Sequence, residues 1–285
     1  MSSSLALIGF GEAGSTFARA GEWRARAFDI AADRTAVMAG IGVESAPSLA
    51  EVLGGASLVL SLVTADQALA VARQCAALIA PEALFCDMNS VAPGTKRAAA
   101  QAFAAAGKRY VDVAIMAPVN PARLAVPLNI AGPDAAEAQE ALGALGFQKT
   151  AIVGESVGRA SAIKLTRSVM VKGLEALTAE MMLAAEAEGV AEEVLASLDA
   201  SEKRDSWFER ADYNLDRMLV HGRRRSAEMA EAAAMLRDLG IEPLMTDGTV
   251  RRQQELGELA INPPPSGFPA KLAAIHTSQT SKGEN

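Results

Sequence analysis

A glycine-rich turn directly after a short apolar segment constrains this chain most. Residues 5–8 are Leu-Ala-Leu-Ile, and they are followed by Gly9-Phe10-Gly11-Glu12-Ala13-Gly14. An apolar strand leading into Gly-x-Gly-x-x-Gly is typical of a strand–turn–helix unit that holds a pyrophosphate. Its glycines allow the tight turn, the approach of the backbone to the phosphates and the packing of the helix on the strand. The N–H groups at the start of that helix attract the anion. The sequence therefore predicts a dinucleotide-binding fold.

An acid stands where such folds bind the ribose. Asp29 is the one acid in the mostly apolar run 25–30, fifteen residues beyond Gly14. A carboxylate at this place accepts hydrogen bonds from the ribose hydroxyls of NAD and repels the additional phosphate of NADP. Arg34, five residues further on, could reach that phosphate. The sequence thus favours NAD over NADP.

Composition limits the other classes of function. Half of the 285 residues are hydrophobic and the net charge is −7, which argues against a nucleic-acid partner. No apolar run reaches the roughly 18 residues of a membrane span. The two cysteines have no partners at metal-ligand spacing, so we expect metal-free chemistry in a soluble, cytoplasmic protein.

The order of apolar and helical segments predicts two domains. Up to residue 155, short apolar runs alternate with helical patterns, which is typical of a mostly parallel sheet of the Rossmann type. A long helical stretch over 157–189 opens an all-helical domain over 156–265, and the polar residues 266–285 read as a flexible tail. The strands are expected at 5–10, 25–29, 42–43, 57–63, 84–87, 110–114, 128–131 and 148–153. The later helices are expected at 192–198, 201–211, 213–219, 223–239 and 248–260.

Lys164 is the strongest candidate for acid–base chemistry. It lies in the long helical stretch among apolar residues, and Ser168 shares its face of the helix. Apolar surroundings disfavour the charged form of a lysine, so its pKa, about 10.4 when free, can fall toward the range of a general base. The alternative, which spacing alone leaves open, is a solvated lysine on an amphipathic helix.

Four motifs in sequence order resemble one superfamily. After the glycine turn come Asp87-Met-Asn-Ser90-Val-Ala-Pro93, then Val111-Asp112 leading to Pro118, then Gly154 and Gly158 followed by Lys164. This order is similar to that of the β-hydroxyacid dehydrogenases, which include 3-hydroxyisobutyrate and 6-phosphogluconate dehydrogenases. The resemblance covers about residues 5–175. The rest is similar to a poorly characterised branch with a 6-phosphogluconate dehydrogenase-like C-terminal domain.

The resemblance implies a role for individual residues. Lys164 matches the lysine that exchanges a proton with the substrate hydroxyl during hydride transfer. Ser90 matches a substrate contact, and the helical domain of such proteins forms a homodimer. The expected cofactor-binding set is Gly9, Phe10, Gly11, Glu12, Ala13, Gly14, Asp29, Val63, Thr64 and Asn89.

Two departures from the superfamily pattern bear on the substrate. Ser168 stands where relatives carry Asn, and Met116-Ala117-Pro118 stands where they carry Ser-Gly-Gly. The lost Ser-Gly-Gly loop puts the usual short hydroxy acid in doubt, and Arg167 or the run Arg223–Arg225 could contact an anion instead. The expected substrate-binding residues are Ser90, Met116, Ala117, Arg167 and Ser168.

These observations predict an NAD-dependent dehydrogenase that oxidises a β-hydroxy acid or a related alcohol. One alternative is a nucleotide-binding sensor or scaffold without hydride transfer. Another is an imine or enamine reductase in the same fold, and the retained Lys164 counts against it because imine reductases place another residue there. Neither His221 nor His276 reads as the catalytic base.

Overall fold

The computed structural model of the chain describes residues 4–201 and 206–283. The chain forms two compact units, residues 1–169 and 170–285, which are described separately below. The division falls within one long helix, α7 (Arg159–Ala187), so the domain boundary expected at residue 155 stays a prediction. In the described part of the chain, no helix has the length and apolar character to cross a membrane.

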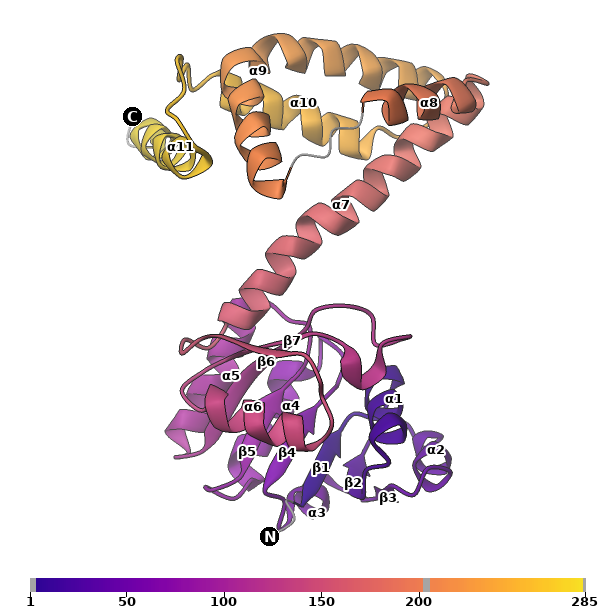
Figure 1. Ribbon diagram of the computed structural model, residues 1–285, viewed down its shortest axis with the longest axis vertical. Helices are drawn as coiled ribbons and strands as arrows, with labels where there is room; N and C mark the ends of the chain where they lie inside the picture. The colour runs from indigo at the N-terminus through magenta and orange to yellow at the C-terminus, as the bar shows by residue number, and fades with distance from the viewer. Residues whose placement is uncertain (1–3, 202–205, 284–285) are drawn as a thin grey trace. The chain divides into compact units, whose positions relative to one another are not determined.

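The first unit is built on a single eight-stranded sheet (Figure 1). Its strand order is β3-β2-β1-β4-β5-β6-β7-β8, and every neighbouring pair is parallel except β6 and β7. The predicted mostly parallel Rossmann sheet is therefore confirmed. The strands are β1 (Leu5–Ile8), β2 (Ala25–Phe28), β3 (Glu44–Ser45), β4 (Leu58–Ser61), β5 (Leu84–Asp87), β6 (Arg109–Ile115), β7 (Leu128–Ala131) and β8 (Thr150–Gly154).

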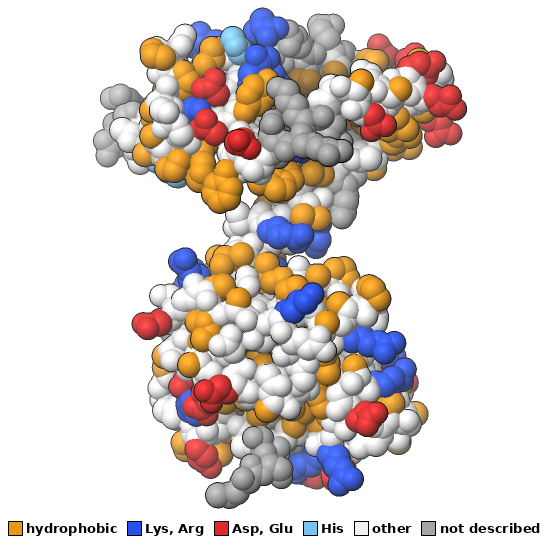
Figure 2. Space-filling view, viewed as in Figure 1, with side chains coloured by type: hydrophobic (Ala, Val, Ile, Leu, Met, Phe, Trp, Pro, Cys, Tyr) orange, Lys and Arg blue, Asp and Glu red, His pale blue; other side chains and the backbone are white. Residues whose placement is uncertain are grey.

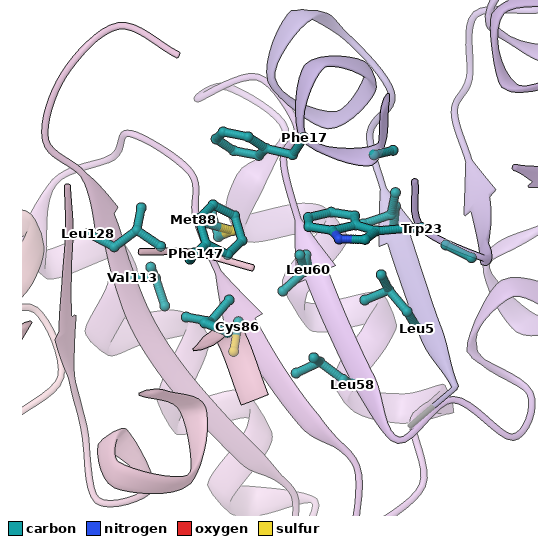
Figure 3. Close-up of a cluster of buried hydrophobic side chains, with 14 of the residues drawn as sticks. Leu5, Phe17, Trp23, Leu58, Leu60, Cys86, Met88, Val113, Leu128 and Phe147 are labelled. Carbon is teal, nitrogen blue, oxygen red and sulfur yellow. The ribbon is translucent and has the colours of Figure 1, made fainter. Parts of the chain in front are cut away.

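Helices cover both faces of this sheet, because alternate side chains of a strand point to opposite faces. Leu5 and Leu7 of β1 join one buried cluster with α1 and α6, while Ala6 and Ile8 join a second with α3, α4 and α5. Figure 3 shows part of the first cluster, where Phe17 of α1 and Phe147 meet edge to face at 5.0 Å. The helices are α1 (Glu12–Gly21), α2 (Arg34–Ala39), α3 (Leu49–Leu53), α4 (Ala68–Leu78), α5 (Pro93–Ala105) and α6 (Ala135–Ala144), with a short 3-10 turn, η1 (Arg123–Ala125).

The second unit is helical. Beyond the later part of α7 it contains α8 (Ala191–Ser201), α9 (Trp207–Asp238), α10 (Leu244–Gly257) and α11 (Phe268–Gly283). The backbones of α9 and α10 meet at Gly222 and Gly257, where a Cβ at Gly222 would lie 2.3 Å from the carbonyl oxygen of Gln253. The all-helical C-terminal part of the predicted fold is thus confirmed.

Two expectations for this unit are wrong in detail. The helices expected at 213–219 and 223–239 are one continuous helix, α9, since Gly222 is a site of helix contact and not a break. Most of the expected tail forms α11, which the buried side chains of Ile275 and Lys271 hold in place. Part of the helix expected at 201–211 lies outside the described residues.

Candidate active site

The glycine turn borders a pocket where the strand order reverses. The sheet proceeds from β1 to β2 on one side and from β1 to β4 on the other. In such sheets ligands bind at this switch point, outside the carboxyl ends of the strands. A pocket of about 170 Å³ lies there. It is lined by Ile8, Gly9, Gly11, Phe28, Asp29, Ile30, Leu49, Leu62, Val63, Thr64, Gln67 and Val71.

Each of the three positions in the turn requires glycine for a different structural reason. Gly9 has a φ of +88°, and a Cβ there would lie 2.5 Å from the carbonyl oxygen of Leu62 at the end of β4. A Cβ at Gly14 would lie 2.7 Å from the carbonyl oxygen of Gly9. A Cβ at Gly11 would meet no atom within 4 Å, so this glycine leaves open space beside the start of α1. The turn therefore fits a pyrophosphate, which needs such a close approach to the backbone.

Asp29 fastens the glycine turn to the end of β2. One carboxylate oxygen accepts a hydrogen bond from the N–H of Phe10 at 2.6 Å, and the other accepts from the N–H of Ala31 at 2.9 Å. Each carboxylate oxygen has a second lone pair, so this half-buried side chain can also accept from a ribose hydroxyl at the pocket. Arg34 pairs with its neighbour Asp33 at 2.6 Å.

Of the other residues expected at the cofactor, some line the pocket and others do not. Val63 and Thr64 line the pocket as Gly9 and Gly11 do. Phe10 contributes its backbone to the turn, because its side chain is fully buried in the core. Glu12 is exposed at the start of α1 and accepts from Asn120 at 3.3 Å. Ala13 packs against the core.

Sequence reasoning missed seven of the residues that line this pocket, among them Ile30 and Gln67. Ile30 is 86% exposed although it directly follows Asp29. An isoleucine at the end of an apolar run reads as part of the strand, so only its exposure in the fold sets it apart. This side chain offers an apolar surface at the mouth of the pocket.

A buried charge network joins the end of β5 to the middle of β6. The ammonium of Lys96, which is fully buried, donates to the Asp87 carboxylate at 2.9 Å and lies 3.4 Å from the Asp112 carboxylate. Asp87 also accepts from the hydroxyl of Tyr110 at 2.7 Å. Burial, and next the charge of Asp87, raise the pKa of this hydroxyl, so it stays protonated and donates. The pairing of charges makes burial of these three ions tolerable.

Asp112 joins this network to the start of α7. Its carboxylate accepts from the N–H groups of Gly158 and Ser161 at 3.0 and 3.2 Å, and from the Ser161 hydroxyl at 2.8 Å. A carboxylate at a helix N-terminus satisfies N–H groups that have no partner within the helix. Lys164 lies three residues beyond Ser161 and is half-buried. The network therefore fixes the first turn of the helix that carries Lys164.

The residues expected near the substrate are dispersed over three segments. Ser90 and Ala117 follow β5 and β6 and are exposed, and Met116 packs against a small cluster that includes Ala160 of α7. Arg167 is exposed on α7, and the Ser168 hydroxyl donates to the carbonyl oxygen of Lys164 at 3.0 Å.

Asn89 is buried and donates to the Ser61 hydroxyl at 2.9 Å. Its own carbonyl oxygen has no hydrogen-bond partner among the described residues. Buried polar atoms usually have a partner, so this oxygen is a candidate acceptor for a ligand group.

Both cysteines of the chain are buried and unpaired. Burial raises the pKa of Cys75 and of Cys86 to about 12, which keeps both thiols protonated at neutral pH. Within residues 4–201 and 206–283, no group of three or more His, Cys, Asp or Glu side chains is arranged to hold a metal ion.

Two protein-family models match the chain. Residues 4–154 match the NAD binding domain of 6-phosphogluconate dehydrogenase, and residues 185–256 match a domain of unknown function, DUF1932. The superfamily resemblance inferred from the sequence motifs is therefore confirmed.

Solved structures agree with this result. A conserved hypothetical protein from Sinorhizobium meliloti 1021 is 35% identical, with 98% of this chain and 97% of that chain covered and a TM-score of 0.61. A conserved protein described as structurally similar to 3-hydroxyacid dehydrogenases is 29% identical, with 95% and 99% covered and a TM-score of 0.60.

A more distant likeness shows the fold alone. The imine reductase from Myxococcus stipitatus, solved with NADP⁺ and, as a variant, with NAD⁺, is 19% and 20% identical, with TM-scores of 0.74. These two structures cover 96% and 97% of this chain, and 99% and 100% of their own chains are covered. The chain thus has a dehydrogenase-like fold with an NAD(P)-binding domain. It belongs to the family defined by the NAD binding domain of 6-phosphogluconate dehydrogenase.

Proposed function

We propose that this protein is an NAD-dependent dehydrogenase that oxidises a β-hydroxy acid or a related alcohol. The observation that carries the proposal is the switch-point pocket, where Gly11 leaves room for a pyrophosphate and Asp29 offers an acceptor to the ribose. Among the relatives, the protein likened to 3-hydroxyacid dehydrogenases supports an alcohol as substrate. NAD would supply the hydride acceptor at this pocket.

Lys164 is the proposed general base. In its neutral form it takes the proton of the substrate hydroxyl while the hydride leaves the same carbon atom, and it returns that proton in the direction of reduction. Asp112 holds the first turn of α7 and thereby limits where the Lys164 side chain can reach. Proton transfer requires the base within hydrogen-bond reach of the reacting hydroxyl, so a fixed helix start favours the reaction.

The proposed cofactor is NAD, with NADP disfavoured. The Asp29 carboxylate would lie close to a phosphate on the ribose, and Arg34 pairs with Asp33. We assign the substrate contacts to Ser90, Met116, Ala117, Arg167 and Ser168, and a cofactor contact to Asn89. The exposed guanidinium of Arg167 suits an anionic hydroxy acid. A cytoplasmic location, which the unpaired cysteines favour, remains a prediction.

The test is a substrate screen that follows the formation of NADH from NAD⁺ with a panel of 3-hydroxy acids. Lys164→Ala should lower kcat by roughly 10²–10⁴-fold. Lys172→Ala, an exposed lysine on the same helix, should leave kcat unchanged. Near-normal turnover by Lys164→Ala would contradict the assignment of the base.

The same screen separates the two alternatives. Oxidation of NADPH with mixtures of an amine and a ketone, but no oxidation of alcohols, would identify an imine reductase. Tight NADH binding without turnover of either class, and no effect of Lys164→Ala, would identify a nucleotide sensor.

We also propose a homodimer formed through the second unit. Met170, Leu174 and Leu177 of α7 follow the spacing of one helix face and are 46%, 46% and 41% exposed. Figure 2 shows hydrophobic side chains at the surface of the unit that contains α8 to α11. Exposed apolar faces of this kind mark protein interfaces, and an equal face on a second copy is complementary to it. Light scattering should give twice the chain mass, and Leu174→Glu with Leu177→Glu should give the monomer, whereas Lys172→Glu should not.

A further inference from the structure

The second unit contains a hollow of its own between α9 and α10. It has a volume of about 220 Å³. Three of its side chains, Tyr213, Arg217 and Arg225, recur at multiples of four residues along α9 and so lie along one side of the helix. The hollow, called the α9–α10 site below, is lined by Tyr213, Asn214, Arg217, Met218, Arg225 and Gln253.

The wall of this site is fixed by the contact between the two helices. At Gly222 and Gly257 the backbones are so close that no side chain fits between them. The Ser226 hydroxyl also donates to the carbonyl oxygen of Val250 at 3.1 Å. Gln253 of α10 is thereby held against α9, and only 8% of it is exposed.

The polar atoms of this wall lack partners. The Nε atoms of Arg217 and Arg225 and the side-chain oxygen of Gln253 are buried without a hydrogen bond in the described part of the chain. Buried donors and acceptors ordinarily have partners, because an unpaired group loses its hydration without compensation. Three of the residues that line the hollow thus carry an unsatisfied polar atom, two of them cationic donors and one an acceptor.

Two acids of α9 are paired with a different cation. Asp212 and Asp216 bind the buried ammonium of Lys271 at 2.8 and 3.2 Å. The guanidinium of Arg217 instead lies 6.0 Å from the centre of the Tyr213 ring, which limits its freedom without satisfying its hydrogen bonds. Guanidinium groups bind carboxylates and phosphates through paired N–H donors.

A second hollow extends the site toward apolar side chains. It has a volume of about 340 Å³, shares Met218 and Gln253 with the α9–α10 site, and is also lined by Leu244 and Met245. Leu244 is 67% exposed. A ligand that reaches both hollows would combine an oxyanion with an apolar body.

We propose that the α9–α10 site binds a small organic anion, with its carboxylate or phosphate at Arg217 and Arg225 and its apolar body over Met218 and Leu244. A hydroxyl beside the anionic group would donate to Gln253. All residues that line the site belong to the second unit, whereas the glycine turn and Lys164 belong to the first.

Calorimetric titration of the full chain tests this proposal, with phenyl phosphate, benzoate and inorganic phosphate as probes and benzyl alcohol as the neutral control. Saturating NADH is present throughout to occupy the pyrophosphate turn. At least one aromatic anion should bind, more tightly than inorganic phosphate, and benzyl alcohol should not bind. A preference for phenyl phosphate or for benzoate tells whether the natural ligand is a phosphate ester or a carboxylic acid.

Arg225→Gln and Gln253→Glu should each lower the affinity for the anion about tenfold or more. Arg223→Gln removes the same charge from an exposed neighbour outside the site and should change the affinity less than twofold. Thermal unfolding of each variant checks that it is folded. If Arg225→Gln does not fold, Gln253→Glu still tests the site.

Failure of all three anions to bind, or an equal loss in Arg223→Gln, would overturn the proposal. So would conversion of a dimer to a monomer by Arg225→Gln without any anion binding, because the arginine would then face a second copy of the chain. Activity with NAD plays no part in these readouts, so their outcome is separate from that of the dehydrogenase proposal.

Discussion

Removing the Lys96 ammonium should lower the free energy of unfolding, because two buried carboxylates would then lack their shared cation. Lys96 is fully buried, and its ammonium donates to the carbonyl oxygen and the carboxylate of Asp87 while it faces Asp112 at 3.4 Å. Methionine has a similar length and no charge. In Lys96→Met both carboxylates would remain buried, with side chains 2% and 0% exposed, and without their shared cation.

The expected loss follows from what remains around each carboxylate. Asp87 would keep the Tyr110 hydroxyl, and Asp112 would keep the first turn of α7. Removing one partner of a buried ion pair costs about 3–5 kcal/mol. This is a large part of the roughly 5–15 kcal/mol by which domains are stable. The double variant Lys96→Met/Asp112→Asn should lose less than the sum of the two single variants, since it also removes one unpaired charge.

Urea unfolding followed by the fluorescence of Trp23 measures this loss. Trp23 is buried in the first unit, and a Trp207→Phe background removes the signal of the other tryptophan. Lys149→Met, at an exposed lysine of the same unit, should change the free energy of unfolding by less than about 0.5 kcal/mol. If Lys96→Met lost no more than Lys149→Met, the network would have no part in holding the first unit together.

Three further predictions concern packing and pH. Gly222→Ala should destabilise the chain by about 1–3 kcal/mol in thermal unfolding, because its Cβ meets α10, whereas Gly248→Ala, with no neighbour within 4 Å, should not. Although burial acts to raise the pKa of Glu180, hydrogen bonds from Thr246 and Met245 prevail and lower it. The stability that Glu180→Gln removes should thus be present above about pH 4.3 and vanish as the pH falls below it. Burial, and next Asp87, raise the pKa of Tyr110. Tyr213→Phe leaves Tyr110 as the one tyrosine of the chain. In this variant no phenolate absorbance should appear near pH 10, and the stability that Tyr110 contributes should be lost only as the pH rises above 10.

The sheet could be predicted from sequence because its signals are local. Buried parallel strands are apolar on both faces, as Leu58, Val59 and Leu60 are, and the turn at Gly9 needs a glycine for its own backbone geometry. α9 could not be delimited in this way. A glycine such as Gly222 usually indicates the end of a helix. Only the close approach of α10 explains why a glycine occupies the middle of this continuous helix.

The C-terminal helix was missed because its polar residues bond to their own backbone. The hydroxyls of Thr277, Ser278 and Thr280 donate to carbonyl oxygens in the preceding turn of α11. A run of Ser, Thr and Lys reads as a loose tail, and the anchoring contact is remote in sequence. Lys271 reaches Asp212 across 59 positions of the chain.

The site divides in the same way. The pocket residues Gly11 and Asp29 follow a motif with fixed spacing, so they could be named in advance. The charge network could not, because Asp87 and Asp112 become neighbours only through the register of β5 and β6. A lysine such as Lys96 in an otherwise ordinary helix reads as a surface residue, although here it is fully buried.

The pocket at the glycine turn is tested most directly by a fluorescence titration with NADH and NADPH. Gly11→Ala provides the matched variant, because an added Cβ meets nothing in the fold but occupies the space assigned to the pyrophosphate. We predict that the wild-type chain binds NADH more tightly than NADPH, and that Gly11→Ala weakens NADH at least tenfold with unchanged thermal stability. A folded wild-type chain that binds neither nucleotide, or a Gly11→Ala variant that binds NADH as well as the wild type, would contradict the account.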